Sequence, residues 1–293
     1  MLPLYDAIAP DTLDEALGAL ADRRNVVPIA GGTNLVVAMR EGAHRGATLL
    51  DVSGLHELRG IQLEDGHIVV GAATTVAELL RSPLIAQHAW ALHQAAISFA
   101  NPLVRNRATV AGNLVDASPA ADMAPPLLVL DAELELLGKN GSRWVAMDQF
   151  IVRANQTVRR SDELVRRIRW PLPTSPRSAG AFHKLALRKG TACSVLSVAV
   201  MIMADGEACV TQARIALGAL AAKPFRAHAA EEALRGQRLT EGRIAEAAHL
   251  AAEATRPIDD VRSTAAYRRR MAGVLTRRML VEVAAESGIG APQ

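Results

Sequence analysis

The sequence predicts an α+β fold built in two parts, and three features of the chain lead to this prediction. Apolar runs of strand length alternate with amphipathic runs of helix length through the first half. Later, a nearly continuous apolar run from Val195 to Met203 precedes a hairpin signal and three helical runs. The segment from Pro171 to Ser178 holds three prolines in eight residues and is the clearest linker. We therefore expect one domain at 1–175, subdivided into 1–53 and 54–175, and a second at 176–293.

The first subdomain reads as a small α/β unit. Thr12 to Ala21 has helical periodicity, and Glu15 follows Thr12 at the capping-box spacing. Short apolar runs at Val26 to Ala30 and Thr48 to Val52 are typical of strands. Between them, a glycine turn at 31–34 is followed by a helix-like run. Successive backbone N–H groups in such a turn can surround an anion.

The second subdomain is expected to carry a mixed or antiparallel sheet together with several helices. Its predicted strands are His67 to Ala72, Glu133 to Leu137, Arg143 to Ala146 and Leu164 to Trp170, and its predicted helices are Val76 to Leu80 and Ser82 to Ala100.

The last third is expected to form a three-stranded sheet with a helical bundle. In the final helix, five apolar residues at helical spacing predict one buried face: Tyr267, Met271, Val274, Leu275 and Met279. The expected strands are Phe182 to Leu187, Val195 to Met203 and Val210 to Leu217, and the expected helices are His228 to Leu234, Gly242 to Ala254 and Ala265 to Glu286.

A second polar, glycine-containing segment runs from Phe99 to Asp131. Glycine lets a backbone approach a ligand closely, and short polar side chains suit a ribityl or phosphate chain. We interpret it as a binding loop leading into a helix whose start, at 120–124, carries Asp122. The alternative is an ordinary capped helix start, with Ser118 as N-cap and Pro119 at N1. Neither glycine segment matches the dinucleotide fingerprint or the P-loop.

At these segments the chain resembles the FAD-binding medium subunit of the molybdenum hydroxylases, the group of xanthine dehydrogenase, carbon monoxide dehydrogenase and aldehyde oxidoreductase. The motifs are AGGTNL at 30–35 and VRNRATVAGNLVDASPAADMAPPLLVLDA at 104–132. FHKLALRKG at 182–190, IALGALAAKPFRA at 215–227 and DDVRSTAAYRRRMAGVLTRRML at 259–280 continue the resemblance to nearly the whole chain. Two positions depart from the family pattern: Ala111, where a glycine pair is common, and Asn34, where Asp is frequent.

The resemblance implies a two-part FAD-binding domain of the PCMH type and a set of non-covalent cofactor contacts. The first loop would wrap the diphosphate, Asp122 would bond to ribityl hydroxyls, and Lys184 would reach the flavin from the C-terminal domain. A surface lysine is the alternative for Lys184. The implied contacts are Ile29, Ala30, Gly31, Gly32, Thr33, Asn34, Leu35, Phe99, Val104, Ala108, Thr109, Gly112, Asn113, Asp116, Ser118, Ala121, Asp122, Val165 and Lys184.

The resemblance further implies an electron-transfer role for the chain. In the family, a large subunit holds molybdopterin and oxidises the substrate, and a small subunit carries 2Fe–2S clusters. FAD on the medium subunit passes the electrons to an acceptor such as NAD⁺, dioxygen or a quinone. We therefore expect a heterotrimer, doubled in the complex. A self-contained flavoenzyme of the vanillyl-alcohol oxidase or enolpyruvyl-glucosamine reductase type is the first alternative, and a scaffold that lacks the cofactor is the second.

Composition argues against several other function classes. The 293 residues are 50% hydrophobic and only 3% aromatic, so the core must consist of aliphatic side chains. The net charge is +3, and the arginine clusters at 166–169, 268–270 and 277–278 are interpreted as solvated faces or protein interface. Cys193 and Cys209 are expected to be reduced, and two cysteines cannot hold a four-thiolate cluster. The sequence shows no signal peptide, membrane span or metal-ligand pattern, so we expect a soluble cytoplasmic protein.

Overall fold

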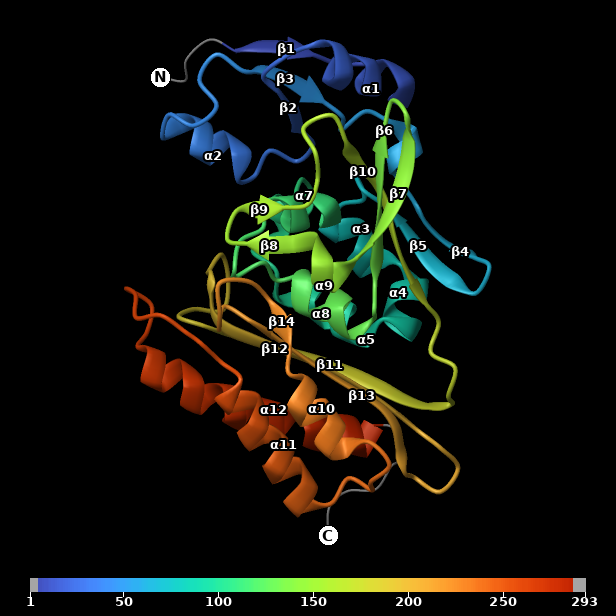
Figure 1. The fold of residues 1–293 in the computed structure, drawn as a ribbon, viewed down its shortest axis with the longest axis vertical. Coiled ribbons are helices and arrows are strands. Elements are labelled where there is room, and N and C mark those ends of the chain that lie inside the picture. Colours follow the sequence, from blue (N-terminus) through green and yellow to red (C-terminus); the bar gives the residue numbers. More distant parts are fainter. Residues whose placement is uncertain (1–4, 287–293) are drawn as a thin grey trace.

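The computed structural model describes residues 5–286. Residues 1–4 of the first expected domain and residues 287–293 of the second lie outside the described residues. Three units follow one another along the long axis of the molecule (Figure 1). A small N-terminal unit lies at one end, a five-stranded sheet with helices lies in the middle, and a four-stranded sheet backed by helices lies at the other end. Among residues 5–286, no helix combines the length and the apolar run that crossing a bilayer requires.

The N-terminal unit is a three-stranded parallel sheet in the order β1-β3-β2. Its elements are β1 (Asp6–Ile8), α1 (Leu13–Asp22), β2 (Val26–Ile29), α2 (Leu35–Arg40) and β3 (Thr48–Asp51). Thr12 caps α1 as predicted, because its side chain accepts a bond from the Glu15 N–H at 3.2 Å. The Glu15 carboxylate, however, accepts from the Asp11 N–H at 2.9 Å and not from Thr12, so the capping box does not close on itself.

The middle unit is built on an antiparallel sheet in the order β4-β5-β10-β6-β7. Along β10, Ile168 and Trp170 are buried, whereas Arg167 and Arg169 alternate with them and pair with Glu135 and Glu133 of β6. The sheet strands are β4 (Ile61–Glu64), β5 (His67–Gly71), β6 (Glu133–Gly138), β7 (Gly141–Ala146) and β10 (Leu164–Pro171). The remaining elements are η1 (His56–Leu58), α3 (Val76–Arg81), α4 (Pro83–His88), α5 (Trp90–Ser98), α6 (Pro102–Arg105), α7 (Val110–Val115), α8 (Ala124–Val129), α9 (Met147–Phe150), β8 (Ile151–Arg153) and β9 (Gln156–Thr157).

Two helix predictions in this unit are wrong. The single helix expected from Ser82 to Ala100 is two helices, α4 and α5, because the backbone of Ala89 leaves helical geometry at φ −132° and ψ 54°. The helix expected to start at 120–124 begins only at Ala124. Ser118 does not cap it; its hydroxyl instead accepts a bond from the Ala120 N–H at 3.2 Å within a turn. Asp122 therefore lies in a non-helical turn just before α8.

The C-terminal unit has the three expected long strands and one short additional strand, in the order β11-β12-β13-β14. The strands are β11 (Arg177–Ala186), β12 (Ser194–Ala204), β13 (Val210–Gly218) and β14 (Phe225–Arg226), and the helices are α10 (His228–Leu234), α11 (Glu241–Glu253) and α12 (Ala265–Glu286). Every residue of β12 is buried. Ala199 and Met201 join the core of the middle unit, whereas Val198 and Val200 join the core formed with α10, α11 and α12. The sheet therefore has a core on each face, which explains the continuous apolar run.

The predicted apolar face of α12 is only partly right. Leu275 and Met279 are buried, but Tyr267 and Val274 are 39% and 37% exposed. The buried stripe instead includes Arg268, which was expected on a solvated face. Its Nη2 lies 2.6 Å from Oδ1 of Asp260, so an ion pair compensates the buried charge.

Candidate functional site

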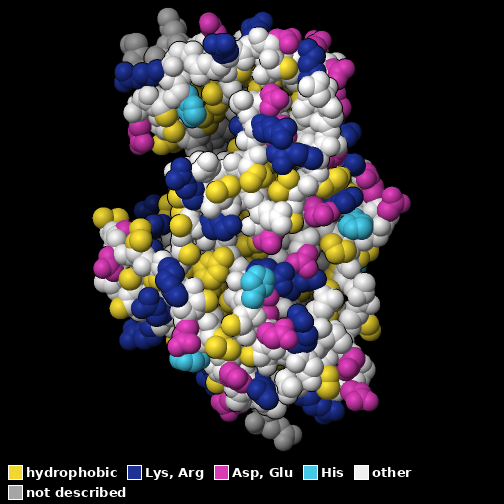
Figure 2. Space-filling model, in the orientation of Figure 1, with side chains coloured by type: hydrophobic (Ala, Val, Ile, Leu, Met, Phe, Trp, Pro, Cys, Tyr) yellow, Lys and Arg dark blue, Asp and Glu magenta, His cyan; other side chains and the backbone are white. Residues whose placement is uncertain are grey.

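A cleft of about 710 Å³ lies where the N-terminal unit meets the middle unit. Figure 2 shows the surface hollowed at this junction, with the N-terminal unit above it. The turn between β2 and α2 lines one side, and α7, the β8–β9 hairpin and the start of β10 line the other. Two glycine segments that are far apart in the sequence therefore share one cavity.

The turn between β2 and α2 requires its two glycines for different reasons. A Cβ on Gly31 would lie 2.0 Å from the backbone oxygen of Arg107, which is far inside van der Waals contact. Gly32 has φ 68°, in the left-handed region that glycine adopts without strain. Among the described residues, the backbone N–H groups of Gly32, Thr33 and Asn34 bond to no carbonyl oxygen. The turn thus presents consecutive free donors in a wall of the cleft.

The second glycine segment is held by backbone pairing around α7. The N–H of Val110 donates to the Thr74 oxygen at 3.1 Å, and the N–H of Val76 donates to the Ala108 oxygen at 2.9 Å. Thr109 caps α7, because its hydroxyl accepts from the Gly112 N–H at 3.1 Å. The segment expected to be a loop is therefore a short capped helix fixed to the start of α3.

Asn113 and Asp116 connect α7 to its surroundings. The Oδ1 atom of Asn113 accepts from the Met123 N–H at 3.0 Å and so orders the turn that carries Asp122. Across the cleft, Nδ2 of Asn34 donates to Oδ2 of Asp116 at 2.9 Å. This bond and the close approach of Gly31 to Arg107 hold the two glycine segments against each other.

The structure brings most of the predicted contact residues together around the cleft. Those that line it are Ile29, Ala30, Gly31, Gly32, Thr33, Asn34, Leu35, Phe99, Ala108, Thr109, Gly112, Asn113, Asp116 and Val165. Five predicted residues lie outside its lining: Val104, Ser118, Ala121, Asp122 and Lys184.

Lys184 and Asp122 form a buried ion pair behind the second glycine segment. Nζ of Lys184 lies 2.6 Å from Oδ2 of Asp122, and their side chains are 6% and 7% exposed. The alternative of a surface lysine is therefore wrong. Ser194 completes the site, because its hydroxyl donates to Oδ1 of Asp122 at 2.7 Å. Lys184 on β11 and Ser194 on β12 thus anchor the turn before α8 to the C-terminal sheet.

A second set of charges supports this anchor from α12 and the segment just before it. Arg262 donates from Nη1 to the backbone oxygen of Ser194 at 3.0 Å and pairs with Asp260 at 2.6 Å. Arg268 reaches the other oxygen of the same carboxylate. Burial raises the pKa of Asp260, but the hydrogen bonds donated by Arg262 and Arg268 outweigh it and hold the pKa well below its usual range. The carboxylate therefore stays ionised and keeps both guanidinium groups in place.

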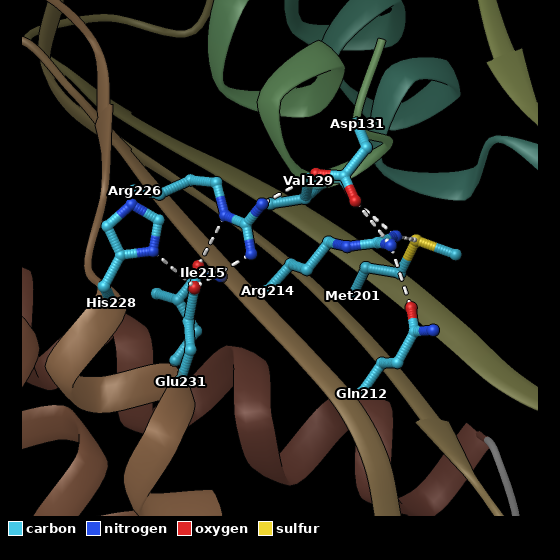
Figure 3. A network of polar contacts seen from close by, with 9 residues as sticks. All are labelled: Val129, Asp131, Met201, Gln212, Arg214, Ile215, Arg226, His228 and Glu231. Carbon is cyan, nitrogen blue, oxygen red and sulfur yellow. Dashed lines mark hydrogen bonds and ion pairs between the residues drawn. The ribbon is translucent and has the colours of Figure 1, made fainter. Parts of the chain in front are cut away.

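A third network joins the C-terminal sheet to the end of α8 (Figure 3). Asp131, just past α8, pairs with Arg214 at 2.5 Å and with Arg226 at 2.6 Å. Glu231 of α10 accepts bonds from Nε of Arg226 at 2.8 Å and from the Ile215 N–H at 2.9 Å, and Nδ1 of His228 lies 3.0 Å from its second oxygen. Burial lowers the pKa of Arg226, but the bond to Glu231 and the surrounding carboxylates raise it overall.

Sequence reasoning missed part of the cleft lining. The cleft residues that were not among the predicted contacts are Val27, Pro28, Ala38, His44, Val52, Leu58, Ala72, Ala73, Ala111, Val115, Asn155, Gln156, Thr157, Arg159 and Leu164. The β8–β9 hairpin supplies several of them, and its strands of three and two residues are too short to show a period. One signal was present: Asn155 occupies the left-handed turn position, at φ 58°, which asparagine favours.

Arg159 is the missed residue with the most distinctive surroundings. Its Nη1 donates to the backbone oxygens of Arg160 and Glu163 at 2.8 and 2.7 Å. Burial lowers the pKa of Arg159, and the nearby charges of Glu163 and Asp162 only partly oppose this effect. A guanidinium nevertheless stays charged at neutral pH.

The cleft suits a flavin dinucleotide in size, donors and apolar surface. A volume of about 710 Å³ is within the range of cofactor sites. Consecutive free N–H groups at Gly32 to Asn34 match the needs of a phosphate chain. The aliphatic side chains of Val52, Leu58 and Leu164 offer surface to an aromatic ring. Gly31, which lies so close to the Arg107 backbone that there is no room for a Cβ, is also part of the wall of this cleft.

Comparison with known proteins agrees with this chemistry over nearly the whole chain. Residues 4–173 match the family model of the FAD binding domain in molybdopterin dehydrogenase, and residues 181–283 match that of the CO dehydrogenase flavoprotein C-terminal domain. The carbon monoxide dehydrogenase medium chain of Afipia carboxidovorans is 32% identical over 276 residues, which are 94% of each chain. The xanthine dehydrogenase FAD-binding subunit of Escherichia coli O157:H7 is 29% identical over 94% of this chain and 95% of its own.

A solved structure gives the same result. In carbon monoxide dehydrogenase from Hydrogenophaga pseudoflava, one chain superimposes with a TM-score of 0.93 at 30% identity, over 98% of this chain and 99% of that one. These relatives are named as subunits or chains of larger enzymes, and a self-contained flavoenzyme is not favoured. This chain belongs to the family of FAD-binding medium subunits of the molybdenum hydroxylases.

Proposed function

We propose that this chain holds FAD non-covalently in the cleft between the N-terminal and middle units and passes electrons from the iron–sulfur clusters of a partner subunit to an external acceptor. One observation carries the proposal. Two glycine segments, more than seventy positions apart, meet across one cleft through the Asn34–Asp116 bond and the Gly31–Arg107 contact. The first segment presents free backbone donors there, at Gly32, Thr33 and Asn34.

Each part of the site has a definite task in this proposal. The N–H groups of Gly32, Thr33 and Asn34 would bind diphosphate oxygens, and Thr109 with the start of α7 would face them. Bound FAD supplies the exchange between one-electron carriers and a two-electron acceptor. The Lys184–Asp122 pair keeps a fixed positive charge and a fixed carboxylate behind the second segment. We propose that these two side chains, with Val104, Ser118 and Ala121, complete the flavin contacts.

The names of the relatives support a division of labour among subunits. A medium chain or FAD-binding subunit is, by its name, one chain of a larger enzyme. We propose that the large partner carries molybdopterin, that the small partner carries the 2Fe–2S clusters, and that two such heterotrimers associate. Within residues 5–286, no cluster of His, Cys, Asp or Glu could hold a metal ion. The electron acceptor is proposed to be a small molecule or a quinone.

Two further proposals concern domain limits and compartment. We place the domain boundary at residue 175, and the segment between β10 and β11 together with the matched ranges 4–173 and 181–283 supports that position. We also propose a cytoplasmic location. The two free thiols, exposed Cys193 and half-buried Cys209, are typical of a reducing compartment.

Co-expression with the neighbouring genes tests the function. The purified material should contain three polypeptides, show flavin absorption bands, release FAD on denaturation, and contain iron and molybdenum. Flavin in a chain that has no partners and turns over an organic substrate alone would instead establish a self-contained flavoenzyme. A colourless protein that stays colourless after FAD is added would contradict the cofactor assignment itself and favour the scaffold alternative.

A further inference from the structure

The cleft has an unusual charge balance for a site proposed to take a diphosphate. Two phosphate groups bring negative charge, and Asp116 adds a carboxylate to the lining. Among the described residues that line the cleft, Arg159 is the one with a permanent positive charge. His44 also lines it, but the charge of a histidine is not permanent. Backbone donors alone would therefore have to offset the phosphate charge if Arg159 took no part.

Half-buried Arg159 also differs from most of the buried and half-buried arginines among the described residues in having no carboxylate partner. Arg143 pairs with Glu163 at 2.8 Å, Arg226 with Glu231 at 2.8 Å, and Arg268 with Asp260 at 2.6 Å. Half-buried Arg105 and Arg177 form no ion pair with a described residue either, but they do not line the cleft. Within residues 5–286, no carboxylate oxygen lies within ion-pair distance of Arg159. Charges removed from water are normally paired, so a half-buried guanidinium that lines a cleft without an ion-pair partner is suited to bind an anionic ligand.

Two carboxylates follow Arg159 closely in sequence: Asp162 makes no ion pair with it, and Glu163 is already fully engaged elsewhere. Glu163 accepts two bonds from Arg143, at 2.8 and 2.9 Å, and a third from the Arg160 N–H at 2.8 Å. It offers Arg159 only its backbone oxygen. The guanidinium is thus oriented by two neutral carbonyls, through Nη1 alone, while Nε and Nη2 make no hydrogen bond within the described residues.

The segment that carries Arg159 is fixed against the second glycine segment. The N–H of Asn155, at the tip of the β8–β9 hairpin, donates to the Ala117 oxygen at 2.9 Å, two residues beyond α7. The N–H of Arg159 donates to the Thr157 hydroxyl at 3.3 Å. Its backbone position is therefore set by the same elements that form the proposed phosphate site.

We propose that Arg159 is the cationic residue that meets the diphosphate of the bound dinucleotide and makes the site select FAD over flavins without a diphosphate. This inference rests on the proposed function, since it requires FAD in this cleft. A charge-assisted hydrogen bond from a preoriented guanidinium to phosphate is among the stronger polar contacts in proteins. The residue would therefore decide specificity as well as affinity.

The neighbouring Arg160 provides a matched control. It is exposed, does not line the cleft, and makes hydrogen bonds only through its backbone within the described residues. The full-length chain, freed of flavin, would be titrated with FAD, ADP and riboflavin as wild type, R159Q, R159K and R160Q. ADP probes the diphosphate without the flavin ring, and riboflavin probes the ring without the diphosphate.

The inference predicts that R159Q weakens FAD and ADP binding by about 10- to 100-fold and leaves riboflavin binding unchanged. R160Q should bind all three ligands as wild type does, and R159K should fall between wild type and R159Q. Equal affinities of R159Q and R160Q for FAD and ADP would overturn the inference. So would an equal loss for FAD and riboflavin, because that would show a distorted cleft and not a lost phosphate contact.

Two readouts keep the test decisive. If R159Q does not fold, the salt dependence of ADP binding to wild type and R159K replaces it: weakening with salt supports a cationic site, and no change overturns it. Absence of FAD binding by the wild type would instead refute the proposed function. The two failures are therefore distinguishable.

Discussion

Nζ of Lys184 and Oδ2 of Asp122 lie 2.6 Å apart in the interior, where the turn before α8 meets strand β11. Asp122 belongs to the N-terminal domain that we propose, and Lys184 belongs to the C-terminal one. Ser194 satisfies the second carboxylate oxygen, so the buried charge is fully bonded. This contact joins the flavin-binding half of the chain to the sheet that follows it, and it makes the two halves depend on each other for stability.

The first prediction concerns the removal of one partner of this pair. Lys184→Met leaves the Asp122 carboxylate buried without its cation, so it should reduce the free energy of unfolding by about 3–5 kcal/mol. Urea denaturation of the flavin-free chain measures this loss. Lys189→Met is the control: Lys189 is exposed, so this variant should lose less than about 0.5 kcal/mol in unfolding free energy.

A double variant, Lys184→Met with Asp122→Asn, should recover part of the stability that Lys184→Met loses. If the losses of the two single variants instead add up in the double variant, the two side chains are not coupled.

The second prediction concerns the contact between the two glycine segments. Gly31→Ala places a methyl group 2.0 Å from the Arg107 oxygen, so the turn must move away from α7. We expect a loss of about 1–3 kcal/mol in unfolding free energy and at least tenfold weaker FAD binding, measured by flavin fluorescence. Gly18→Ala is the control: nothing lies within 4 Å of its Cβ position in α1, and alanine should stabilise the helix by up to about 1 kcal/mol. Unchanged FAD affinity in Gly31→Ala would show that the Gly31–Arg107 contact does not contribute to FAD binding.

The regular elements of the chain could be predicted from its sequence where a period or an apolar run was long enough. The bounds of α10 and α12 agree with the prediction, and β12 follows the apolar run at 195–203 closely. The glycine turn at 31–34 also lies between a strand and a helix as expected. In each case the local pattern and the tertiary packing favour the same structure.

The failures have physical causes that no local pattern reveals. The break at Ala89 lies in a stretch that contains no glycine and, after Pro83, no proline, so only packing against β11 and α3 distinguishes two helices from one. Arg268 is buried because Asp260, eight residues earlier, returns to meet it. Arg159 looks like half of an exposed Arg-Arg pair, and only the fold shows that one arginine lines the cleft while the other faces solvent.

The third prediction concerns Glu231, the centre of the network in Figure 3. Glu231→Ala removes the acceptor of Arg226, of the Ile215 N–H and of His228, and leaves a guanidinium partly buried. The expected loss is about 3–5 kcal/mol in unfolding free energy, because uncompensated buried groups lose their hydration without a partner. Thermal or urea unfolding measures it.

The adjacent Glu232 is the control for this variant. Its side chain is 68% exposed and pairs only with Arg235, whereas that of Glu231 is 5% exposed. Glu232→Ala should therefore change stability by less than about 0.5 kcal/mol. Similar losses in the two variants would contradict the role assigned to the buried network.

The fourth prediction concerns acid sensitivity at Asp260. Its pKa is depressed in the folded state by Arg262 and Arg268, so its contribution is fully present above the unfolded value of about 3.9 and is lost as pH falls below it. Wild type should thus lose stability progressively below about pH 4. Asp260→Asn should be less stable at pH 7, because it leaves Arg268 buried beside a neutral amide, and its stability should decline less steeply in acid.

Urea midpoints across this pH range measure both effects. Asp14→Asn is the control, because Asp14 is an exposed residue in the first turn of α1. A pH profile for Asp260→Asn that runs parallel to that of wild type would mean that other carboxylates set the acid sensitivity, and that the Arg262–Asp260–Arg268 cluster does not.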